Sequence, residues 1–327
     1  MTSTSSTRIG IACGMGAGAL WGFVFLAPEL ARAFTPLQLA IGRYAAYGLI
    51  SAILIAPRLR ELASMLGRRE WLSLAWLSLA GNVLYYVLLS AAVQSGGIAM
   101  TSLVIGFLPV AVTIIGSRDH DAAPLRMLVP SLALCVAGAI CIGWQALAVP
   151  GTEGTRGLIC AIGALLSWTA YAVGNSRCLA RLRHVSVHDW NLLTGIVTGA
   201  LSLLLIPVTL IAEPIRHSAG EWLRFAGVVA GVALLASIAG NALWNRMSRL
   251  LPLTMVGQMI LFETLFALLY GFLWERRLPH PLEIAAFALV TASVLSCIAA
   301  HRGPTKGTPA ESELSAGVGA PGSVGRR

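Results

Sequence analysis

The sequence predicts an all-helical, polytopic membrane protein in which ten transmembrane helices form two inverted five-helix repeats. Three observations favour this fold class: the composition, the length of the apolar runs and a motif that recurs about half a chain later. The 327 residues are 57% hydrophobic and 11% charged, whereas an average soluble domain carries about 25% charged residues. A large soluble domain therefore does not fit into this chain.

The apolar runs give the positions of the spans. A spanning helix needs roughly 20 apolar residues, so residues 9–300 have room for about ten, bounded by charges, Pro or Gly. We place the spans at residues 9–28, 36–57, 71–93, 97–116, 125–144, 157–176, 188–211, 224–246, 253–274 and 281–300. The first run lacks the small-residue cleavage site of a signal peptide, and we therefore interpret it as a span.

The basic residues indicate the direction of the spans, because cytoplasmic loops carry an excess of Lys and Arg. With these boundaries, 16 of the 23 Lys and Arg residues fall on the side of the N-terminus, six fall on the other side, and Arg43 lies within a span. The net charge of +9 lacks the clustering and the interleaved aromatics of a nucleic-acid surface. We expect an inner (plasma) membrane protein surrounded by the lipid bilayer, with both termini in the cytoplasm and no nucleic acid as a partner.

The chain is expected to divide into four parts. These are a cytoplasmic N-terminus (1–8), a first five-helix repeat (9–147), a second five-helix repeat (156–300) and a disordered cytoplasmic tail (301–327). The tail is rich in Gly, Pro, Ser and Ala with few large apolar residues, a composition that cannot bury a core.

A motif of the third span recurs in the eighth. The segments SLAGNVL (78–84) and SIAGNAL (237–243) are identical at five of seven positions, and GALW (18–21) resembles GALLSW (163–168). The heptapeptides lie 159 residues apart, close to half of the ordered chain, so each half holds five spans. Because five is odd, the second half enters the membrane from the opposite side, which is typical of secondary transporters.

Several short segments carry a resemblance to a known family. They are GALW (18–21), IGRY (41–44), LPV (108–110), FET (262–264) and WE (274–275). Over roughly residues 9–300, the chain resembles the EamA-type permeases of the drug/metabolite transporter (DMT) superfamily, although Thr264 and Trp274 stand where that family usually has Pro and Gly. The resemblance implies a transporter that exports small metabolites such as amino acids.

Two helix faces are the first candidates for substrate binding. Polar groups are costly near the bilayer centre, so each one is a functional candidate. The residues are Asn82, Tyr85 and Tyr86 on the third span and Asn241, Trp244 and Asn245 on the eighth. Their i, i+3, i+4 spacing places each trio on one face, where amides and rings could line a cavity for a small amphipathic solute. The alternative is that the amides only bond neighbouring helices to each other.

The sixth span carries a similar stripe of Trp168, Tyr171 and Asn175, and Trp168 has a repeat counterpart in Trp21. These aromatic residues are candidates for the same cavity. An orientation toward lipid or the membrane interface is an equal alternative.

Glu263 is the only acidic residue near the middle of a span, about 15 Å from the start of the ninth at 1.5 Å per residue. Burial favours the protonated form of a carboxyl, so Glu263 is the candidate coupling residue if protons drive transport, or a ligand for a substrate amine. The alternatives are a structural, hydrogen-bonded carboxyl and a permanent ion pair with Arg43.

Arg43 lies roughly 10 Å inside the second span, so it must face protein or water. It could bind a substrate carboxylate, pair with Glu29 at the end of the first span, or pair with Glu263. Gln258 either points into the same cavity or makes a packing contact.

Gly10, Gly14, Gly18 and Gly22 form a stripe of small residues that lets another backbone approach the first span closely. The chain has no HExxH, GxSxG or GK[ST] motif, and its six cysteines form no CxxC pair. The sequence therefore predicts no enzyme, no cofactor and no metal site.

We expect a secondary active transporter that moves, and more specifically exports, a small amphipathic metabolite by alternating access. Protons are the candidate coupling ion and a homodimer is the candidate assembly. Uptake or exchange is the alternative within this class, because an inverted repeat has no intrinsic direction. A membrane subunit that does not itself transport is the alternative from another class.

Overall fold

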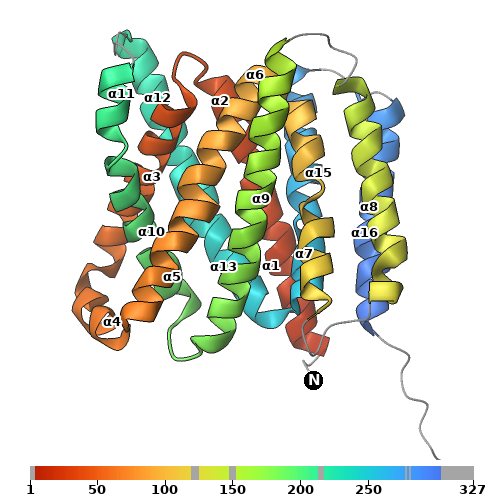
Figure 1. The fold of residues 1–327 in the computed structure, drawn as a ribbon, viewed down its shortest axis with the longest axis horizontal. Helices are drawn as coiled ribbons and strands as arrows, with labels where there is room; N and C mark the ends of the chain where they lie inside the picture. The colour runs from red at the N-terminus through yellow and green to blue at the C-terminus, as the bar shows by residue number, and fades with distance from the viewer. Residues whose placement is uncertain are drawn as a thin grey trace, which may run out of the picture.

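The computed structural model describes residues 4–118, 125–146, 152–212, 217–276, 278–279 and 281–302. All regular secondary structure in these ranges is helical. Figure 1 shows the helices running side by side, with α1 beginning and α16 ending at the same end of the bundle. We call this end the N-terminal end and the other the opposite end. The predicted all-helical class is confirmed.

The helices follow the two halves of the chain. The first half contains α1 (Thr4–Gly22), η1 (Phe23–Phe25), α2 (Ala27–Leu30), α3 (Pro36–Ile55), η2 (Ala56–Arg58), α4 (Leu59–Met65), α5 (Arg68–Ser78), η3 (Leu79–Leu84), α6 (Tyr85–Ile105), α7 (Leu108–Gly116) and α8 (Leu125–Ala146). The second half contains α9 (Thr152–Arg181), α10 (Val187–Leu203), α11 (Ile206–Ala212), α12 (Ala219–Val232), η4 (Ala233–Gly240), α13 (Asn241–Leu250), α14 (Leu253–Met259), α15 (Leu261–Glu275) and α16 (Pro281–Arg302).

Within the described ranges, seven helical segments are long and apolar enough to cross a membrane. They are Ser5–Leu30, Pro36–Met65, Arg68–Ile98, Gly154–Arg181, Val187–Leu210, Ala219–Leu250 and Leu253–Trp274. They correspond to the first three predicted spans and to the sixth through the ninth. The fifth and tenth predicted spans contain the shorter apolar helices Leu125–Cys141 and Ile284–Ala300.

The fourth predicted span, residues 97–116, is not one continuous helix, and that part of the prediction is corrected. Gly97 has a φ of +81° and interrupts α6, since glycine is the residue that readily adopts this conformation. A second break at Phe107 precedes α7. Pro109 lies in the first turn of α7, where a missing N–H breaks no helical hydrogen bond.

Two segments outside the predicted spans also contain helix. Helix α1 begins at Thr4, so part of the expected N-terminal segment 1–8 belongs to the first helix. The short helix α4 lies between the second and third predicted spans. Of the expected tail, residues 303–327 lie outside the described residues.

The glycine stripe of α1 packs closely against the second half, as predicted. A Cβ atom on Gly18 would lie 2.8 Å from the backbone N of Glu263, and one on Gly22 would lie 3.0 Å from the backbone N of Ala267. Gly14 instead meets side-chain atoms of Met247 and Met259. The first span therefore positions Glu263 through direct backbone contact with α15.

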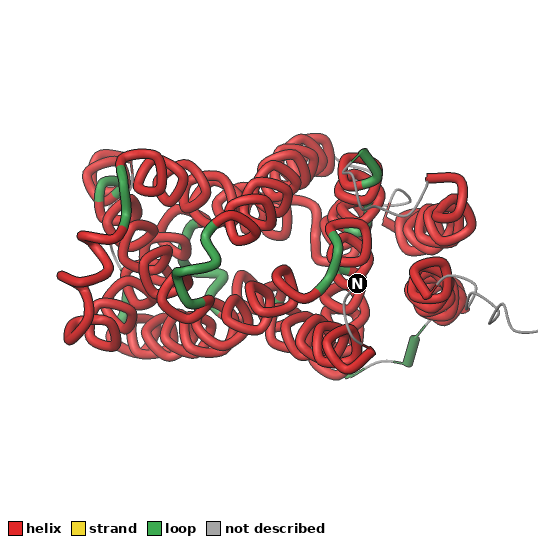
Figure 2. The backbone as a smooth tube through the Cα atoms, turned by 90° about the horizontal axis from the view of Figure 1, so that it is seen from below, coloured by secondary structure: helices red, strands yellow, loops and turns green. Residues whose placement is uncertain are grey.

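Helices at corresponding positions of the two halves pack in pairs: α3 against α10, α7 against α14 and α8 against α16. The α3–α10 crossing is tight, because a Cβ on Gly48 would lie 2.8 Å from the Cα of Gly199. In the third pair, the hydroxyls of Ser131 and Ser293 each donate to the other residue's carbonyl, at 2.9 and 2.6 Å. Figure 2 shows the α8–α16 pair at one end of an elongated cross-section.

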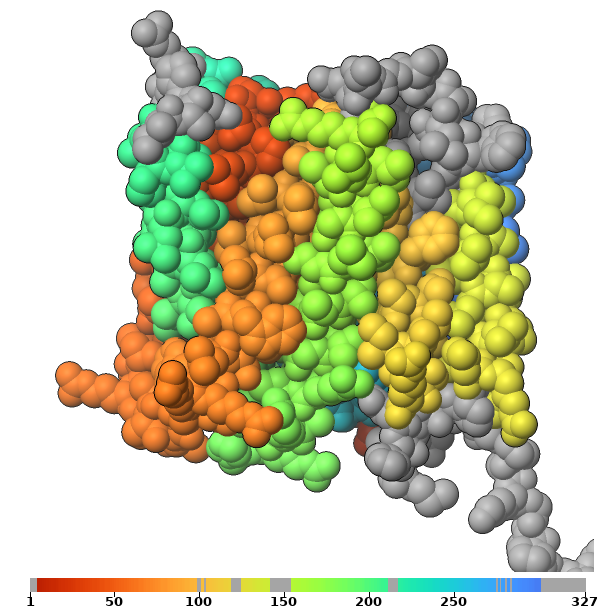
Figure 3. Space-filling model, in the orientation of Figure 1, coloured from red at the N-terminus to blue at the C-terminus, as the bar shows by residue number. Residues whose placement is uncertain are grey.

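The outside of the bundle is apolar. Leu166, Leu204 and Leu223 are among the large apolar side chains that are more than half exposed, and Figure 3 shows one face, to which α6, α9 and α11 contribute. Soluble monomers rarely expose apolar surface of this extent, whereas the acyl chains of a bilayer match it.

Candidate functional site

A small cavity lies inside the bundle between helices of both halves. It is lined by Trp21, Val24, Arg43, Tyr44, Gly81, Asn82, Tyr85, Trp168, Tyr171, Asn241 and Glu263. Its volume of about 20 Å³ holds about one water molecule. Eight of the twelve residues predicted from the sequence therefore face one cavity, which is nearly closed in this conformation.

Two π-helical segments lie at the cavity: η3 contributes Gly81 and Asn82 to its lining, and η4 ends directly before the lining residue Asn241. The segments η3 (Leu79–Leu84) and η4 (Ala233–Gly240) are both π-helical, and each overlaps one copy of the repeated heptapeptide (78–84 and 237–243). Such wide turns are rare and frequently occur at functional sites. The sequence analysis did not predict them.

Side chains from the other half of the chain bond the carbonyls of these wide turns. The indole N–H of Trp21 donates to the Ala236 carbonyl at 3.0 Å, and the hydroxyl of Ser167 donates to the Ala80 carbonyl at 2.7 Å. A side chain that bonds into the backbone ladder is a common cause of such helical irregularities. The first span thus stabilises η4, and the sixth span stabilises η3.

The repeated glycines allow two aromatic residues to approach the π segments. A Cβ on Gly81 would lie 2.1 Å from Cγ of Tyr171, and a Cβ on Gly240 would lie 2.7 Å from Nε1 of Trp21. Each glycine therefore leaves the space in which an aromatic ring of the other half lies. Both aromatic residues line the cavity.

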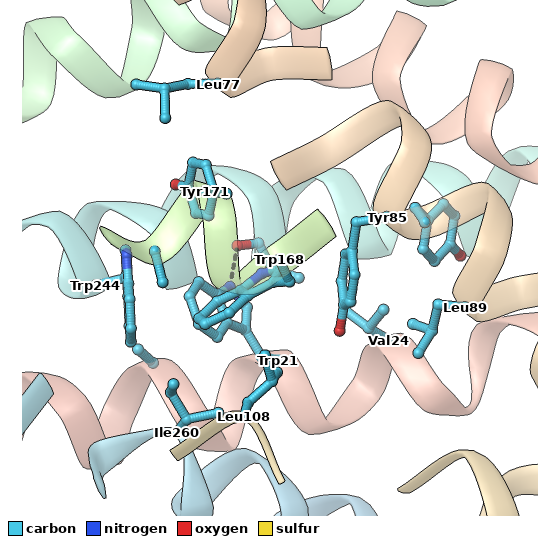
Figure 4. Packing of buried hydrophobic residues seen from close by; sticks show 14 of the residues in the cluster. Trp21, Val24, Leu77, Tyr85, Leu89, Leu108, Trp168, Tyr171, Trp244 and Ile260 are labelled. Atoms are coloured by element: carbon cyan, nitrogen blue, oxygen red, sulfur yellow. Dashed lines mark hydrogen bonds between the residues drawn. The ribbon is translucent and has the colours of Figure 1, made fainter. Parts of the chain in front are cut away.

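The aromatic wall consists of three tryptophans and flanking tyrosines. Ring centroids are 5.7 Å apart for Trp21 and Trp168, 5.0 Å for Trp21 and Trp244, and 5.1 Å for Trp168 and Trp244. Tyr85 and Tyr171 contact Trp168 at 6.2 and 5.8 Å. Figure 4 shows these rings gathered in the interior, so Trp21 and Trp168 do not face lipid.

Arg43 supplies the positive charge of the cavity. Its side chain is buried, with 5% of the residue exposed, and Nε donates to the Ser237 hydroxyl at 3.1 Å. The guanidinium carbon lies 4.4 Å from the ring centroid of Tyr86 and 5.0 Å from that of Tyr44. Nη1 is buried without a hydrogen-bond partner, so this nitrogen and its two N–H groups make no hydrogen bond within the protein.

Glu263 supplies a carboxyl to the same cavity. It is 3% exposed, and its Oε2 atom is buried without a hydrogen-bond partner. In the described part of the chain, no ion pair within 4.0 Å joins Arg43 to Glu263, and Glu29 pairs instead with Arg32 at 2.7 Å. Neither acidic partner considered for Arg43 is bound to it in this conformation.

The amide residues divide between the cavity and interhelical bonding. Asn82 lines the cavity and also donates to the Thr198 hydroxyl at 3.0 Å, and Asn241 lines the cavity. Asn245 lies outside the cavity lining, because its side-chain oxygen accepts from Asn175 at 2.9 Å. The side chain of Asn245 therefore bonds neighbouring helices to each other, which was the alternative to a place in the cavity. The position of Asn241 fits the cavity.

Three further predicted residues do not line the cavity. The side chain of Gln258 is fully buried. Its Nε2 donates to the Thr113 hydroxyl at 3.4 Å, and its Oε1, at 3.2 Å, shares the proton of the Ser293 hydroxyl with the Ser131 carbonyl. Tyr86 lies behind Arg43, and Trp244 lies behind the other two indoles. Gln258 therefore makes a packing contact, which was the alternative to a place in the cavity. Tyr86 and Trp244 pack against residues that line the cavity.

Val24, Tyr44 and Gly81 line the cavity but were not predicted. Val24 lies in the 3-10 segment η1 and Gly81 in the π segment η3, where the helical face rule does not apply. Tyr44 directly follows Arg43, and its ring contacts that of Tyr86 edge-on at 5.8 Å. The repeated glycine of the heptapeptides was a usable sequence signal for Gly81.

The cavity combines a cation, a carboxyl, two amides and an aromatic wall. A zwitterion could satisfy both charges, and the rings would contact its apolar part. In the described ranges, no group of three or more His, Cys, Asp or Glu side chains is arranged to hold a metal ion. The arrangement suits binding of a small amphipathic solute.

Comparisons with known proteins agree with this reading of the chain. A model of the EamA-like transporter family matches residues 8–144 and, a second time, residues 155–299. The inner membrane protein YtfF of Escherichia coli (strain K12) is 29% identical over 319 residues, which cover 89% of this chain and 95% of that protein. A protein of known crystal structure shares the fold, with a TM-score of 0.68 and 20% identity over 92% of this chain and 99% of the other.

Proposed function

The chain belongs to the EamA-like transporter family, and we propose that it is a secondary active transporter that exports a small amphipathic metabolite such as an amino acid. Its relatives support a multi-pass transporter of the inner membrane with a small-molecule substrate, rather than an enzyme. The substrate class, the direction and the mechanism are the proposal.

One observation carries the substrate class. Arg43 and Glu263 line one cavity without pairing, and each has a buried polar atom that no protein group bonds. An unsatisfied buried polar group costs about 1–3 kcal/mol. The carboxylate of an amino acid would complement Arg43, and its ammonium group would complement Glu263.

Glu263 is proposed as the coupling residue. A carboxylate that binds the substrate ammonium cannot bind a proton at the same time, so proton and substrate compete for the same group. Binding of one therefore favours release of the other. This competition suits proton-driven export, in which an entering proton replaces the departing substrate.

The proposed mechanism is alternating access between two inverted repeats. The double family match, the repeated heptapeptides and the two π segments at corresponding positions support the repeat. Trp21 of the first half contacts η4 of the second half, and Tyr171 of the second half contacts η3 of the first half. These reciprocal contacts support a symmetric relationship between the two halves. In such transporters, one repeat rocks against the other around a site near the midplane.

We propose that the N-terminal end of the bundle faces the cytoplasm. The excess of Lys and Arg in the loops on that side of the predicted spans supports this orientation. A homodimer stays a prediction, which the mass of the purified protein in a defined detergent would test.

Transport into proteoliposomes tests the function. A labelled panel of amino acids, nucleosides and aromatic cations would be offered to wild-type protein with and without a pH gradient. We expect at least one amino acid to move and its rate to depend on the gradient. The variant Glu263→Gln, which keeps the shape of the side chain, should lose the dependence on the gradient.

Controls separate coupling from folding. Gln258→Met also alters a buried polar residue of the ninth span, but outside the cavity, and it should keep the dependence on the gradient. The proposal fails if Glu263→Gln transports at the wild-type rate with unchanged pH dependence. If no solute moves, the alternative of a non-transporting membrane subunit is favoured.

A further inference from the structure

The loop between the first two spans and the loop between the sixth and seventh have the same local design. Thr35 caps the N-terminus of α3 and Ser186 caps that of α10, each by accepting an N–H from the first turn. The residue before each cap is apolar and buried: Phe34 is 2% exposed and Val185 is 1% exposed. An apolar residue at this position commonly fixes the path by which the chain enters a helix.

Both loops are also tied to the ends of other helices. The side-chain amide of Gln94, on α6, donates to the Phe34 carbonyl at 3.0 Å. At the end of α13, Arg249 donates to the Val185 carbonyl through a very short contact and to the Leu182 carbonyl at 2.8 Å. In both loops, the carbonyl of the residue before the cap thus accepts a hydrogen bond. The donor lies on the third span in the first half and on the eighth span in the second half.

The two loops close different ends of the bundle. Figure 1 shows the α9–α10 connection at the N-terminal end, where α1 begins, and the α2–α3 connection at the opposite end. The cavity lies between them, lined by residues of α3, α6, α9 and α13. The two loops therefore lie toward opposite ends of the bundle, with the cavity between them.

The side chain of Phe34 fills the opposite end. Its ring stacks between His217 and Phe225, with centroids 4.0 and 4.2 Å away, and meets Trp222 edge-on at 5.0 Å. Phe34 belongs to the first half, and its three ring partners belong to the second. Aromatic pairs of this kind contribute about 0.5–1.5 kcal/mol each beyond burial.

This aromatic cluster packs against the helix that carries Arg43. A Cβ on Gly42 would lie 2.5 Å from Cζ of Phe225, and Gly42 precedes Arg43 on α3. The rings of the cluster are not part of the described cavity lining. They hold α12 against α3 at the opposite end of the bundle.

We propose that Phe34 and Val185 are the paired gates of the transporter, Phe34 closing the opposite end and Val185 closing the N-terminal end. Gln94 and Arg249 are the residues that hold them shut. The proposal rests on the alternating-access part of the proposed function, but not on any particular substrate.

The two gates differ in chemistry. The gate at the opposite end is an aromatic stack with a neutral amide tie, whereas the gate at the N-terminal end depends on a guanidinium that bonds two carbonyls. Removing one gate should therefore expose the cavity from one face of the membrane only.

Thiol labelling tests the gates without a substrate. The reporter is Val24→Cys, at a cavity-lining position, in a background in which the six native cysteines are replaced. A charged, membrane-impermeant methanethiosulfonate is added to one face at a time, with right-side-out or inside-out vesicles. We expect Phe34→Ala to raise the labelling rate about tenfold from one face and Arg249→Gln to raise it from the other.

The two variants control for each other, and Phe287→Ala on the exposed side of α16 serves as a neutral aromatic control. If Phe34→Ala impairs folding, Gln94→Leu removes only the tie and should act from the same face. Unchanged rates, or rates raised from both faces by either variant, overturn the proposal. Because no solute is needed, failure here and failure to transport amino acids are separate results.

Discussion

Tyr171 rests directly on the backbone of Gly81: a Cβ atom at residue 81 would lie 2.1 Å from Cγ and 2.8 Å from Cβ of the tyrosine. The third and sixth spans therefore meet with no room for a side chain at this position. Gly240 and Trp21 form the corresponding contact between the eighth and first spans. Both contacts join the two halves of the chain beside the cavity.

Gly81→Ala should destabilise the protein and reshape the cavity. The added methyl group forces Tyr171 or the helix backbone to move, and overpacking of this kind typically costs about 1–3 kcal/mol. Thermal unfolding in detergent would measure the loss of stability.

Two glycines of α12 provide the matched control. No heavy atom within 4 Å would meet a Cβ on Gly227 or Gly231, and alanine is favoured over glycine inside a helix by about 1 kcal/mol. Gly227→Ala and Gly231→Ala should therefore unfold at the wild-type temperature or above it. An equal loss of stability in all three variants would contradict the assigned role of the Tyr171 contact.

Ser237→Ala should weaken substrate binding through Arg43. The serine hydroxyl accepts the hydrogen bond from Nε, and a hydrogen bond to a charged group contributes about 1.5–3 kcal/mol. We expect the KM of a carboxylate-bearing substrate to rise about tenfold or more, and Ser237→Thr to restore it.

The repeat supplies the control for this variant. Ser78 occupies the same position of the first heptapeptide, but its hydroxyl donates to the Thr194 carbonyl at 3.4 Å instead of contacting Arg43. Ser78→Ala should leave KM unchanged. If both serine variants raise KM equally, the effect comes from packing and not from Arg43.

Gln258→Met should lower stability without changing substrate affinity. It removes hydrogen bonds to Thr113 and Ser293 and leaves their polar atoms with fewer partners, at a cost of about 1–3 kcal/mol. Unfolding temperature and KM, measured on the same preparation, would test this. A large increase in KM would return Gln258 to the binding site.

Asn82→Ala and Asn241→Ala should each weaken transport, because both side chains line the cavity. Loss of one amide hydrogen bond is worth about 1 kcal/mol, which is about fivefold in KM. If the amides contact separate parts of the substrate, the double variant should multiply the two effects. Wild-type KM in the double variant would show that both amides serve only to bond helices.

Much of the architecture followed from the sequence because membrane insertion constrains composition strongly. Apolar runs located the long helices, and the i, i+3, i+4 spacing identified residues such as Asn82 and Tyr85 that face the interior. Rare polar groups within apolar runs, above all Arg43 and Glu263, indicated the cavity. These inferences assumed regular helices, although Asn82 lies in the π segment η3, and they used the cost of burying charge.

The errors have separate causes. Gln258 lies five residues before Glu263, and a helix places residues i and i+5 about 140° apart, so the two side chains do not share a face. The break at Gly97 depends on a positive φ that an apolar run does not reveal. Asn245 was assigned to the cavity because it lies four residues after Asn241. Its actual hydrogen bond is with Asn175, 70 positions away in the sequence, and no local spacing rule detects such a bond.

The two π segments make chain length a constraint at the cavity. A π turn accommodates one residue more than the α-helix it replaces, and each residue rotates a helix by about 100°. Removing a single residue from 79–84 would restore the regular α-helical hydrogen bonds. It would also rotate Tyr85 and the rest of α6 away from their present neighbours. Deletions there should be far less tolerated than substitutions. In related sequences, each of the two segments should keep its one extra residue.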